Sequence, residues 1–311
     1  MTIQNICVLG GGGFVGSHLV PLLAARGYQV LVPTRRRERA KHLLVLPGVE
    51  VVEADIHDPA TLRSLLAGMD AAINLIGILH ERRPGDFQQA HVELPRKVIA
   101  ACAASGVDRL LHMSALGAAA DSQSRYQQSK AAGEALARAL PGATVFRPSV
   151  IFGPGDSFLA LFADLLKLAP VLPLASAAAR FQPVFAGDVA RAFADALERP
   201  ETMNQGYDLC GPNIYSLADL VRLTAATLGL KRSVLPLGVS TSYWFARLME
   251  LKPGAKLMTR DNHYAMQRDN VCPAGCAQPF GPPTALEGVI GYLREAGPRR
   301  EYMEFRSSAG R

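Results

Sequence analysis

Short runs rich in apolar residues alternate with longer segments of helical periodicity along the first half of the chain. The runs, each long enough for one strand, lie at residues 6–9, 29–33, 49–55, 71–77 and 109–114. A continuous apolar run bounded by turn residues is typical of a strand buried on both faces. Strands that alternate with helices predict an α/β fold, which is here a doubly wound parallel sheet with helices on both faces.

The first run leads directly into a glycine-rich turn, which an apolar helical segment at 17–27 follows. Gly10 permits a sharp turn out of the strand, Gly13 lets the backbone approach a pyrophosphate, and Gly16 lets the helix pack closely on the strand. A helix N-terminus also offers N–H groups to phosphates. A purely structural turn is the alternative, but the strand before it and the helix after it favour dinucleotide binding. The residues expected to contact the cofactor here are Gly10, Gly13, Phe14, Val15 and Gly16.

The second run, 29–33, ends without the acidic residue that binds the ribose 2′-hydroxyl in NAD-type sites. Thr34, Arg35 and Arg36 follow it instead. Guanidinium groups suit a 2′-phosphate through paired hydrogen bonds, so these three residues favour NADP(H) over NAD(H), with Arg35 nearest to the strand end. The alternative is a solvated basic start of a helix.

The third run ends at Asp55, and Ile56 follows it. Open α/β sheets bind ligands at this end of their strands. We expect Asp55 to accept from an adenine amino group and Ile56 to pack on the ring. Asp58, just before a helical segment at 60–66, is interpreted as the helix N-cap.

The fourth run, 71–77, predicts a buried strand whose small last residue, Gly77, lies beneath the cofactor ribose. A helix over 86–105 follows. Pro95 falls inside it, which predicts a kink or a break at that point. His91 lies just before the proline, and we assign it no role.

Ser114 ends the fifth run, and Tyr126 and Lys130 follow in a helical pattern. At i and i+4, Tyr126 and Lys130 share one helix face. A free tyrosine has a pKa of about 10, and a nearby ammonium favours its phenolate. We therefore expect Tyr126 to exchange a proton with a carbonyl or alcohol oxygen that Ser114 orients, while Lys130 lowers the tyrosine pKa and holds the nicotinamide ribose. An ordinary exposed helix face is the alternative.

Over residues 1–155 the chain resembles an extended short-chain dehydrogenase/reductase, the family of the NAD-dependent nucleotide-sugar epimerases and dehydratases. The motifs that carry the resemblance are Gly10-x-x-Gly13-x-x-Gly16, Asp55, Asn74-x-x-Gly77, Ser114, Tyr126-x-x-x-Lys130 and Arg147-Pro148 through Gly155. The resemblance implies a Rossmann-type domain and a nicotinamide cofactor, with Asn74 and Pro148 among its contacts.

A narrower resemblance covers most of the chain. Residues 113–118, 124–126 and 257–262 are similar to the branch of the family that includes the NADPH-binding accessory subunit of respiratory complex I and its bacterial relatives. That branch implies a bound nucleotide with a structural role, so the Ser/Tyr/Lys set does not by itself establish an enzyme. Leu9 replaces the threonine that usually precedes the first glycine, which removes one hydrogen bond from the turn.

The resemblance also implies a domain division. Residues 1–155, which 181–199 rejoin, are expected to form the dinucleotide-binding domain, and residues 156–311 mostly a smaller α+β lobe for substrate or partner. Asp188 is interpreted as a helix N-cap, and Ser216 with Asp219 as a capping box.

The composition and net charge of the chain exclude some classes of protein. The chain has 311 residues, 49% of them hydrophobic and 19% charged, which allows a sizeable core and excludes global disorder. Its net charge of +6 suits an anionic cofactor but is too thinly spread to indicate nucleic acid. The most apolar later stretch, 159–179, is interrupted by charged residues and prolines and predicts no membrane span.

The five cysteines predict free thiols in a reducing compartment rather than a disulfide framework, because only Cys272 and Cys276 lie close in sequence. A zinc site needs a fuller ligand set, so no metal is expected. The first strand begins without a charged, cleavable leader, and we expect a cytoplasmic protein.

Two functions follow from these residues. The first is an NADP(H)-dependent oxidoreductase or epimerase-like enzyme that moves a hydride between the nicotinamide and a carbonyl or alcohol carbon of an unidentified small molecule. The alternative is a non-catalytic NADPH-binding accessory or assembly protein of a respiratory or quinone-related complex, peripheral at the inner face of the membrane. The aromatic and basic stretch 243–252 fits such a contact, although a core helix of the smaller lobe is the favoured interpretation.

Overall fold

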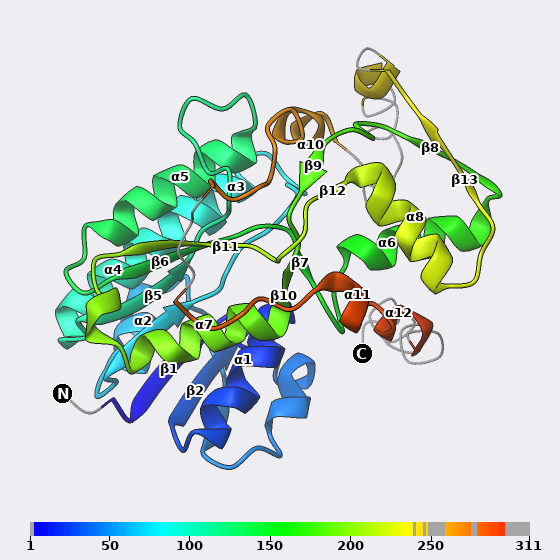
Figure 1. The fold of residues 1–311 in the computed structure, drawn as a ribbon. Helices are drawn as coiled ribbons and strands as arrows, with labels where there is room; N and C mark the ends of the chain where they lie inside the picture. The colour runs from blue at the N-terminus through cyan, green and yellow to red at the C-terminus, as the bar shows by residue number, and fades with distance from the viewer. Residues whose placement is uncertain (1–2, 239–240, 245–246, 248–258, 275–278, 296–311) are drawn as a thin grey trace. The chain divides into compact units, whose positions relative to one another are not determined.

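The computed structural model describes residues 3–238, 241–244, 247, 259–274 and 279–295 (Figure 1). The chain divides into two compact units. The first comprises residues 1–149, 186–210 and 270–282, and the second comprises 150–185, 211–269 and 283–311. No sequence motif indicated that the short segment 270–282 rejoins the first unit.

The first unit is built on a seven-stranded sheet in which each pair of neighbouring strands is parallel. In spatial order the strands are β11 (Gly206–Leu209), β6 (Thr144–Pro148), β5 (Arg109–Met113), β4 (Ala71–Asn74), β1 (Asn5–Leu9), β2 (Gln29–Thr34) and β3 (Val49–Glu53). The doubly wound parallel sheet predicted from the apolar runs is confirmed. The strand order reverses between β1 and β4, and in such sheets ligands bind beside the carboxyl ends of the strands at the reversal.

Helices cover both faces of this sheet (Figure 1). On β6, Val145 belongs to a buried cluster with leucines of α2 (Pro59–Leu66) and α4 (Leu94–Ser105). The next residue, Phe146, points to the opposite face, where its ring lies 4.3 Å from that of Phe193 in α7 (Ala186–Leu197). α1 (Phe14–Ala25) packs beside α7, and α5 (Arg125–Arg138) packs beside α4. Short 3-10 helices lie at Arg37–Leu43 and Pro200–Thr202.

The helix predicted over 86–105 is present, and its middle is a π-turn. α3 (Asp86–Gln88) runs into the π-turn Gln89–Glu93, which runs into α4. Pro95 has no N–H to donate to the carbonyl of residue 91, and its ring would crowd that carbonyl in a regular helix. The wider turn absorbs both effects, so the expected interruption is confirmed.

Local capping patterns are also confirmed, with one exception. Asp58 caps α2 by accepting from the N–H of Thr61 at 2.8 Å. Ser216 and Asp219 form both bonds of the predicted capping box. Asp188, in contrast, is not an N-cap, because α7 begins at Ala186 and places it in the first turn. There its carboxylate pairs with Arg191 at 2.8 Å and complements the helix dipole.

The second unit has its own core. Its buried cluster joins α6 (Phe158–Leu168) and α8 (Leu217–Thr227), and Leu166, Leu220 and Val221 are fully buried there. The described part of this unit also contains the short elements β7 (Ile151–Phe152), β8 (Val171–Leu174), β9 (Arg180–Phe181), β10 (Val184–Phe185), β12 (Tyr215–Ser216), β13 (Ser233–Pro236), α10 (Arg260–Ala265), α11 (Leu286–Val289) and α12 (Tyr292–Glu295).

The expectation that every cysteine is a free thiol is wrong. Cys210 and Cys272 form a disulfide, although 62 positions separate them in sequence. Such a pair is invisible to sequence spacing because it depends on the return of segment 270–282 to the first unit. Cys7 and Cys102 are free and buried, and Cys276 lies outside the described residues.

The aromatic stretch 243–252 falls mostly outside the described residues. Trp244, which is described, is 62% exposed, and the Arg247 guanidinium lies 5.4 Å from its ring centroid. The exposure contradicts a core-helix assignment for this tryptophan. Among the described residues, the helices are each too short or too polar to cross a bilayer.

Candidate functional site

In the glycine turn after β1, the start of helix α1 packs closely on the backbone of the turn. Gly10 has a φ of +85°, which favours glycine. Gly16 packs so closely on the turn that an added Cβ would lie 2.3 Å from the carbonyl oxygen of Gly11. α1 begins at Phe14, so the N–H groups of Phe14, Val15 and Gly16 have no acceptor within the helix. A turn without side chains that leads into free helix N–H groups fits the phosphates of a dinucleotide.

The end of β2 exposes the predicted basic residues. Thr34 Oγ1 donates to the Arg36 carbonyl at 3.2 Å and accepts from the Arg36 N–H at 3.4 Å. This local turn directs the chain away from the sheet just after the strand. Arg35 and Arg36 are both exposed, so their guanidinium groups are accessible to an anionic ligand.

Asp55 lies in a loop that is fixed from two sides. One of its carboxylate oxygens accepts from the N–H of His57 at 2.9 Å, and the ammonium of Lys97 donates to the His57 carbonyl at 2.8 Å. Asp55 is exposed and Ile56 is half-buried. The loop therefore presents a carboxylate and an apolar side chain together, at the carboxyl end of β3.

Asn74 and Gly77 shape the end of β4. The side-chain oxygen Oδ1 of Asn74 accepts from the N–H of Ile76 at 3.1 Å, and the side-chain nitrogen Nδ2 lies 3.2 Å from His112 Nδ1. Asn74 is 1% exposed, so its side chain supports the loop from beneath. Gly77 lies so near Lys130 that an added Cβ would be 3.0 Å from the Lys130 ammonium nitrogen.

Ser114 is buried beside an ion-pair network. It is 2% exposed, and its hydroxyl helps to lower the pKa of Glu134 on α5. Burial by itself would raise that pKa, but hydrogen bonds from Arg147 and Arg138 outweigh it. Arg147 in β6 also pairs with Asp208 in β11 at 3.1 Å. The Ser114 Oγ itself is buried and has no hydrogen-bond partner among the described residues.

Tyr126 and Lys130 lie in the first half of α5, one turn apart. The Lys130 side chain is buried, and its ammonium donates to the Met113 carbonyl at 3.1 Å. Burial lowers the pKa of Lys130 to about 8. None of the ion pairs found among the described residues involves Lys130. An ammonium without a carboxylate partner is available to favour an anionic phenolate or to bind a ribose hydroxyl.

His91, to which the sequence analysis assigned no role, connects three parts of this site. The N–H of Ile78 donates to His91 Nε2 at 3.0 Å, so the neutral ring carries its proton on Nδ1. Nδ1 then donates to Ser129 Oγ at 2.8 Å, and Ser129 Oγ donates to the Tyr126 carbonyl at 2.8 Å. This chain of bonds links the loop after β4 to the first turn of α5.

The rings around His91 complete the arrangement. Phe87 stacks on His91, with 5.5 Å between centroids, and Tyr126 meets it edge-on at 5.6 Å. Burial, and then the Lys130 ammonium, lower the pKa of His91 to about 3, and the same two causes lower that of His112 to about 3. Both rings are therefore neutral at pH 7, and the positive charge of the group stays on Lys130.

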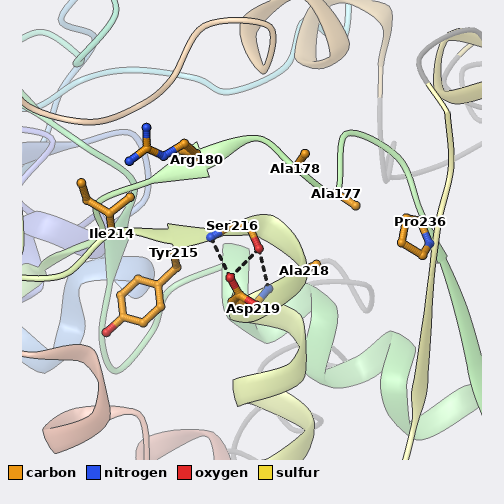
Figure 2. Close-up of a pocket in the computed structure, with 9 residues that line it drawn as sticks. All are labelled: Ala177, Ala178, Arg180, Ile214, Tyr215, Ser216, Ala218, Asp219 and Pro236. Atoms are coloured by element: carbon orange, nitrogen blue, oxygen red, sulfur yellow. Dashed lines mark hydrogen bonds between the residues drawn. The ribbon is translucent and has the colours of Figure 1, made fainter.

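A hollow of about 610 Å³ lies in the second unit (Figure 2). Its polar side chains bond to neighbours within that unit. Ser216 and Asp219 form the capping box, Tyr215 donates to Glu287 at 2.6 Å, and Arg180 pairs with Asp269 at 3.5 Å. None of the residues that the sequence predicted for the site lines this hollow.

Comparisons with known proteins agree with this geometry. A family model described as the NAD dependent epimerase/dehydratase family matches residues 6–210. Over 273 residues the chain is 32% identical to the mouse mitochondrial protein named NADH dehydrogenase (ubiquinone) 1 alpha subcomplex subunit 9, covering 86% of this chain and 72% of that protein. It is 35% identical over 187 residues to the ceramide reductase of Caulobacter vibrioides, covering 60% of this chain and 58% of that protein.

A solved structure confirms the fold. The dTDP-glucose 4,6-dehydratase of Streptomyces venezuelae, determined with NAD bound, superposes with a TM-score of 0.72 at 21% identity, over 96% of this chain and 98% of that one. The family model covers more than half of the sequence, and its description names the nicotinamide cofactor that the glycine turn fits. The chain therefore belongs to the NAD dependent epimerase/dehydratase family, as its motifs indicated.

Proposed function

We propose that this chain binds a nicotinamide dinucleotide at the carboxyl edge of its sheet and transfers a hydride between the nicotinamide and a carbonyl or alcohol carbon. The pyrophosphate lies on the glycine turn before α1. Asp55 and Ile56 hold the adenine, and Asn74 and Gly77 shape the floor beneath the ribose. Pro148, at the end of β6, borders the nicotinamide.

One observation carries the catalytic part of the proposal. Lys130 is a buried ammonium on the same helix face as Tyr126, beside Gly77 in the loop after β4. Such a cation favours the tyrosine phenolate, which takes a proton from an alcohol, or returns it to a carbonyl, as the hydride moves. The bound cofactor supplies or accepts the hydride. Ser114 remains the proposed group for orienting the oxygen, since its buried hydroxyl has no hydrogen-bond partner among the described residues.

The end of β2 supports NADP(H) as the preferred cofactor. Arg35 and Arg36 are exposed where the ribose 2′ position of the cofactor is expected, and the strand ends in Thr34 rather than in an acid. Arginine pairs with a phosphate through two parallel hydrogen bonds. An acidic residue at this position would repel that phosphate.

The catalytic proposal is tested with Tyr126→Phe. The purified protein is given NADPH and a panel of aldehydes and ketones, including acyl-chain and sugar carbonyls, and NADPH absorbance is followed. Tyr126→Phe is expected to lower kcat at least a hundredfold on any substrate found, because it removes the proton donor. The control is Tyr215→Phe, in the second unit. Full activity of Tyr126→Phe would show that another group is the acid.

The relatives named as complex I subunits favour a second candidate, an accessory role in which NADPH is held without turnover. They match over most of this chain. In this role the protein contacts a respiratory complex at the inner membrane face, and exposed Trp244 is a candidate contact. Tyr126→Phe would then bind NADPH normally and support assembly of the complex in cells.

A further inference from the structure

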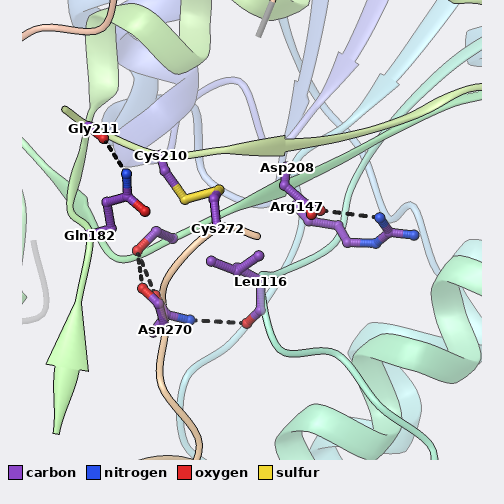
Figure 3. The surroundings of a disulfide bond; sticks show 9 residues. Leu116, Arg147, Gln182, Asp208, Cys210, Gly211, Asn270 and Cys272 are labelled. Carbon is purple, nitrogen blue, oxygen red and sulfur yellow. Dashed lines mark hydrogen bonds and ion pairs between the residues drawn. A yellow bond between two sulfur atoms is a disulfide. The ribbon is translucent and has the colours of Figure 1, made fainter. Parts of the chain in front are cut away.

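A disulfide joins Cys210 to Cys272, and Figure 3 shows it with the neighbouring side chains of Asn270 and Leu116. Cys210 directly follows β11, and its partner Cys272 belongs to the segment 270–282, which we call the strap. The structure describes the strap at 270–274 and 279–282. The bond therefore attaches a late segment of the chain to the carboxyl edge of the sheet.

Asn270, two residues before Cys272, bridges the loops that follow β5 and β6. Its amide nitrogen donates to the Leu116 carbonyl at 3.1 Å, and its side-chain oxygen accepts from Ser149 Oγ at 2.6 Å. Ser149 is 4% exposed and follows Pro148 directly. One side chain of the strap thus holds together two loops at the edge where ligands of such sheets bind.

The far end of the strap is anchored without the disulfide. Phe280 is 3% exposed, and its ring lies 5.0 Å from that of Tyr207 and 5.6 Å from that of Phe146. Arg191 donates to the Phe280 carbonyl at 2.8 Å, and Arg199 donates to that of Pro279 at 2.7 Å. Breaking the disulfide would therefore release only the end that carries Asn270.

The two described free thiols are poorly suited to compete for a reductant or oxidant. Burial raises the pKa of Cys7 to about 12 and that of Cys102 to about 12. A thiol reacts as its thiolate, so both are inert at neutral pH. Cys210 is buried, whereas Cys272 is half-buried, so Cys272 is the more accessible residue of the pair.

We infer that the Cys210–Cys272 disulfide is a redox clasp. When closed, it holds Asn270 against the loops at 114–118 and 147–149, and its reduction by a dithiol loosens these loops and weakens dinucleotide binding. The effect on binding rests on the proposed function, whereas the loosening does not.

The chemistry is a two-electron exchange. A thiolate of the dithiol attacks Cys272 Sγ, the Sγ–Sγ bond breaks, and Cys210 leaves as a thiolate that takes up a proton. The second thiol of the reductant then attacks the mixed disulfide and releases Cys272 as a thiol. The reductant ends as a cyclic disulfide, having supplied two electrons and two protons.

Hydrogen exchange of the full chain, oxidised and after dithiothreitol, tests the clasp. Reduction is expected to speed exchange at least tenfold in peptides that cover 114–118 and 147–149, while peptides from β1 and β2 stay unchanged. Cys272→Ser should exchange like the reduced wild type in both conditions, and the control Cys276→Ser should respond like the wild type. Equal exchange in both states, or thiol titration that finds no pair released by reduction, would overturn the inference.

NADPH titration in the two states separates this inference from the proposed function. Reduction is expected to weaken NADPH binding about fivefold or more. Equal affinity in both states would refute the effect of the clasp on the site. If neither state binds NADPH, the proposed function fails, and the exchange data still decide whether the disulfide holds the loops.

Discussion

At the scale of one residue, the buried ammonium of Lys130 lowers the stability of the folded protein. Its pKa of about 8, against 10.5 for the free side chain, means that burial disfavours the charged form by about 3 kcal/mol. The hydrogen bond from its ammonium to the Met113 carbonyl offsets part of this cost. Residues kept at a stability cost are typical of functional sites.

Lys130→Met is therefore expected to stabilise the fold and impair the site. Removing the buried ammonium while keeping the apolar stem should raise the free energy of unfolding by about 1–2 kcal/mol. NADPH binding should weaken about tenfold through loss of a charged hydrogen bond to the ribose. Denaturant unfolding and NADPH titration measure the two effects. The control is Lys167→Met, at an exposed lysine of the second unit, and a marked loss of stability in Lys130→Met would contradict this account.

Gly133 is a second single-residue test, because it lies against the π-turn. An added Cβ would come within 2.0 Å of the His91 carbonyl oxygen, so Gly133→Ala should push α5 away from that turn and cost at least about 2 kcal/mol of unfolding free energy. The control is Gly288→Ala in α11, where an added Cβ meets nothing within 4 Å and a helical alanine gains up to about 1 kcal/mol. Equal stability of the two variants would show that α5 does not need this close approach.

At the scale of elements, the central contact joins the loop after β4, the π-turn and α5. The bonds from Ile78 through His91 and Ser129 to Tyr126 hold these three elements together. They require His91 to be neutral, because Nε2 accepts from an N–H. The helix face that carries Tyr126 and Lys130 is thus positioned by a neutral imidazole buried beside an ammonium.

This contact predicts a loss of stability in acid. The pKa values of His91 and His112 are lowered to about 3, against 6.5 for a free ring. Between pH 6.5 and pH 3 the unfolded chain therefore binds more protons than the folded one, so stability falls as pH falls through this window, by up to about 1.4 kcal/mol per pH unit for each ring. Urea unfolding at several pH values, with His91→Gln and the exposed control His42→Gln, measures the slope. His91→Gln should be flatter, and an unchanged slope would refute the assignment.

At this scale, the features that could be predicted from the sequence are those that depend on residues close together in the chain. The glycine turn, the Asp58 cap, the Ser216 capping box and the interruption near Pro95 depend on neighbours within a few positions, and the structure confirms these elements. The role of His91 depends on Ile78 and Ser129, which no spacing rule connects to it. The assignment of Asp188 was wrong because the helix begins at Ala186, before Asp188, rather than after it.

At the scale of the whole molecule, the doubly wound parallel sheet was predictable because apolar runs and helical segments alternate, and the resemblance identified the family. The return of segment 270–282 to the first unit was not predictable from the sequence. It depends on contacts of Phe280 and Pro279 with Arg191, Arg199 and Tyr207, which are distant in the sequence. The Cys210–Cys272 disulfide was missed for the same reason. Cofactor preference and turnover stay predictions that binding and kinetic measurements must decide.

The central claim, that the glycine turn and the end of β2 hold NADP(H), is tested most directly by fluorescence titration with NADPH and NADH. The wild type is compared with Arg35→Ala and with Arg39→Ala, a control at an exposed arginine of the following 3-10 helix. We expect NADPH to bind more tightly than NADH, and Arg35→Ala to weaken NADPH about tenfold while leaving NADH unchanged. Arg39→Ala should change neither. If neither cofactor binds the wild type, the account of this site is wrong.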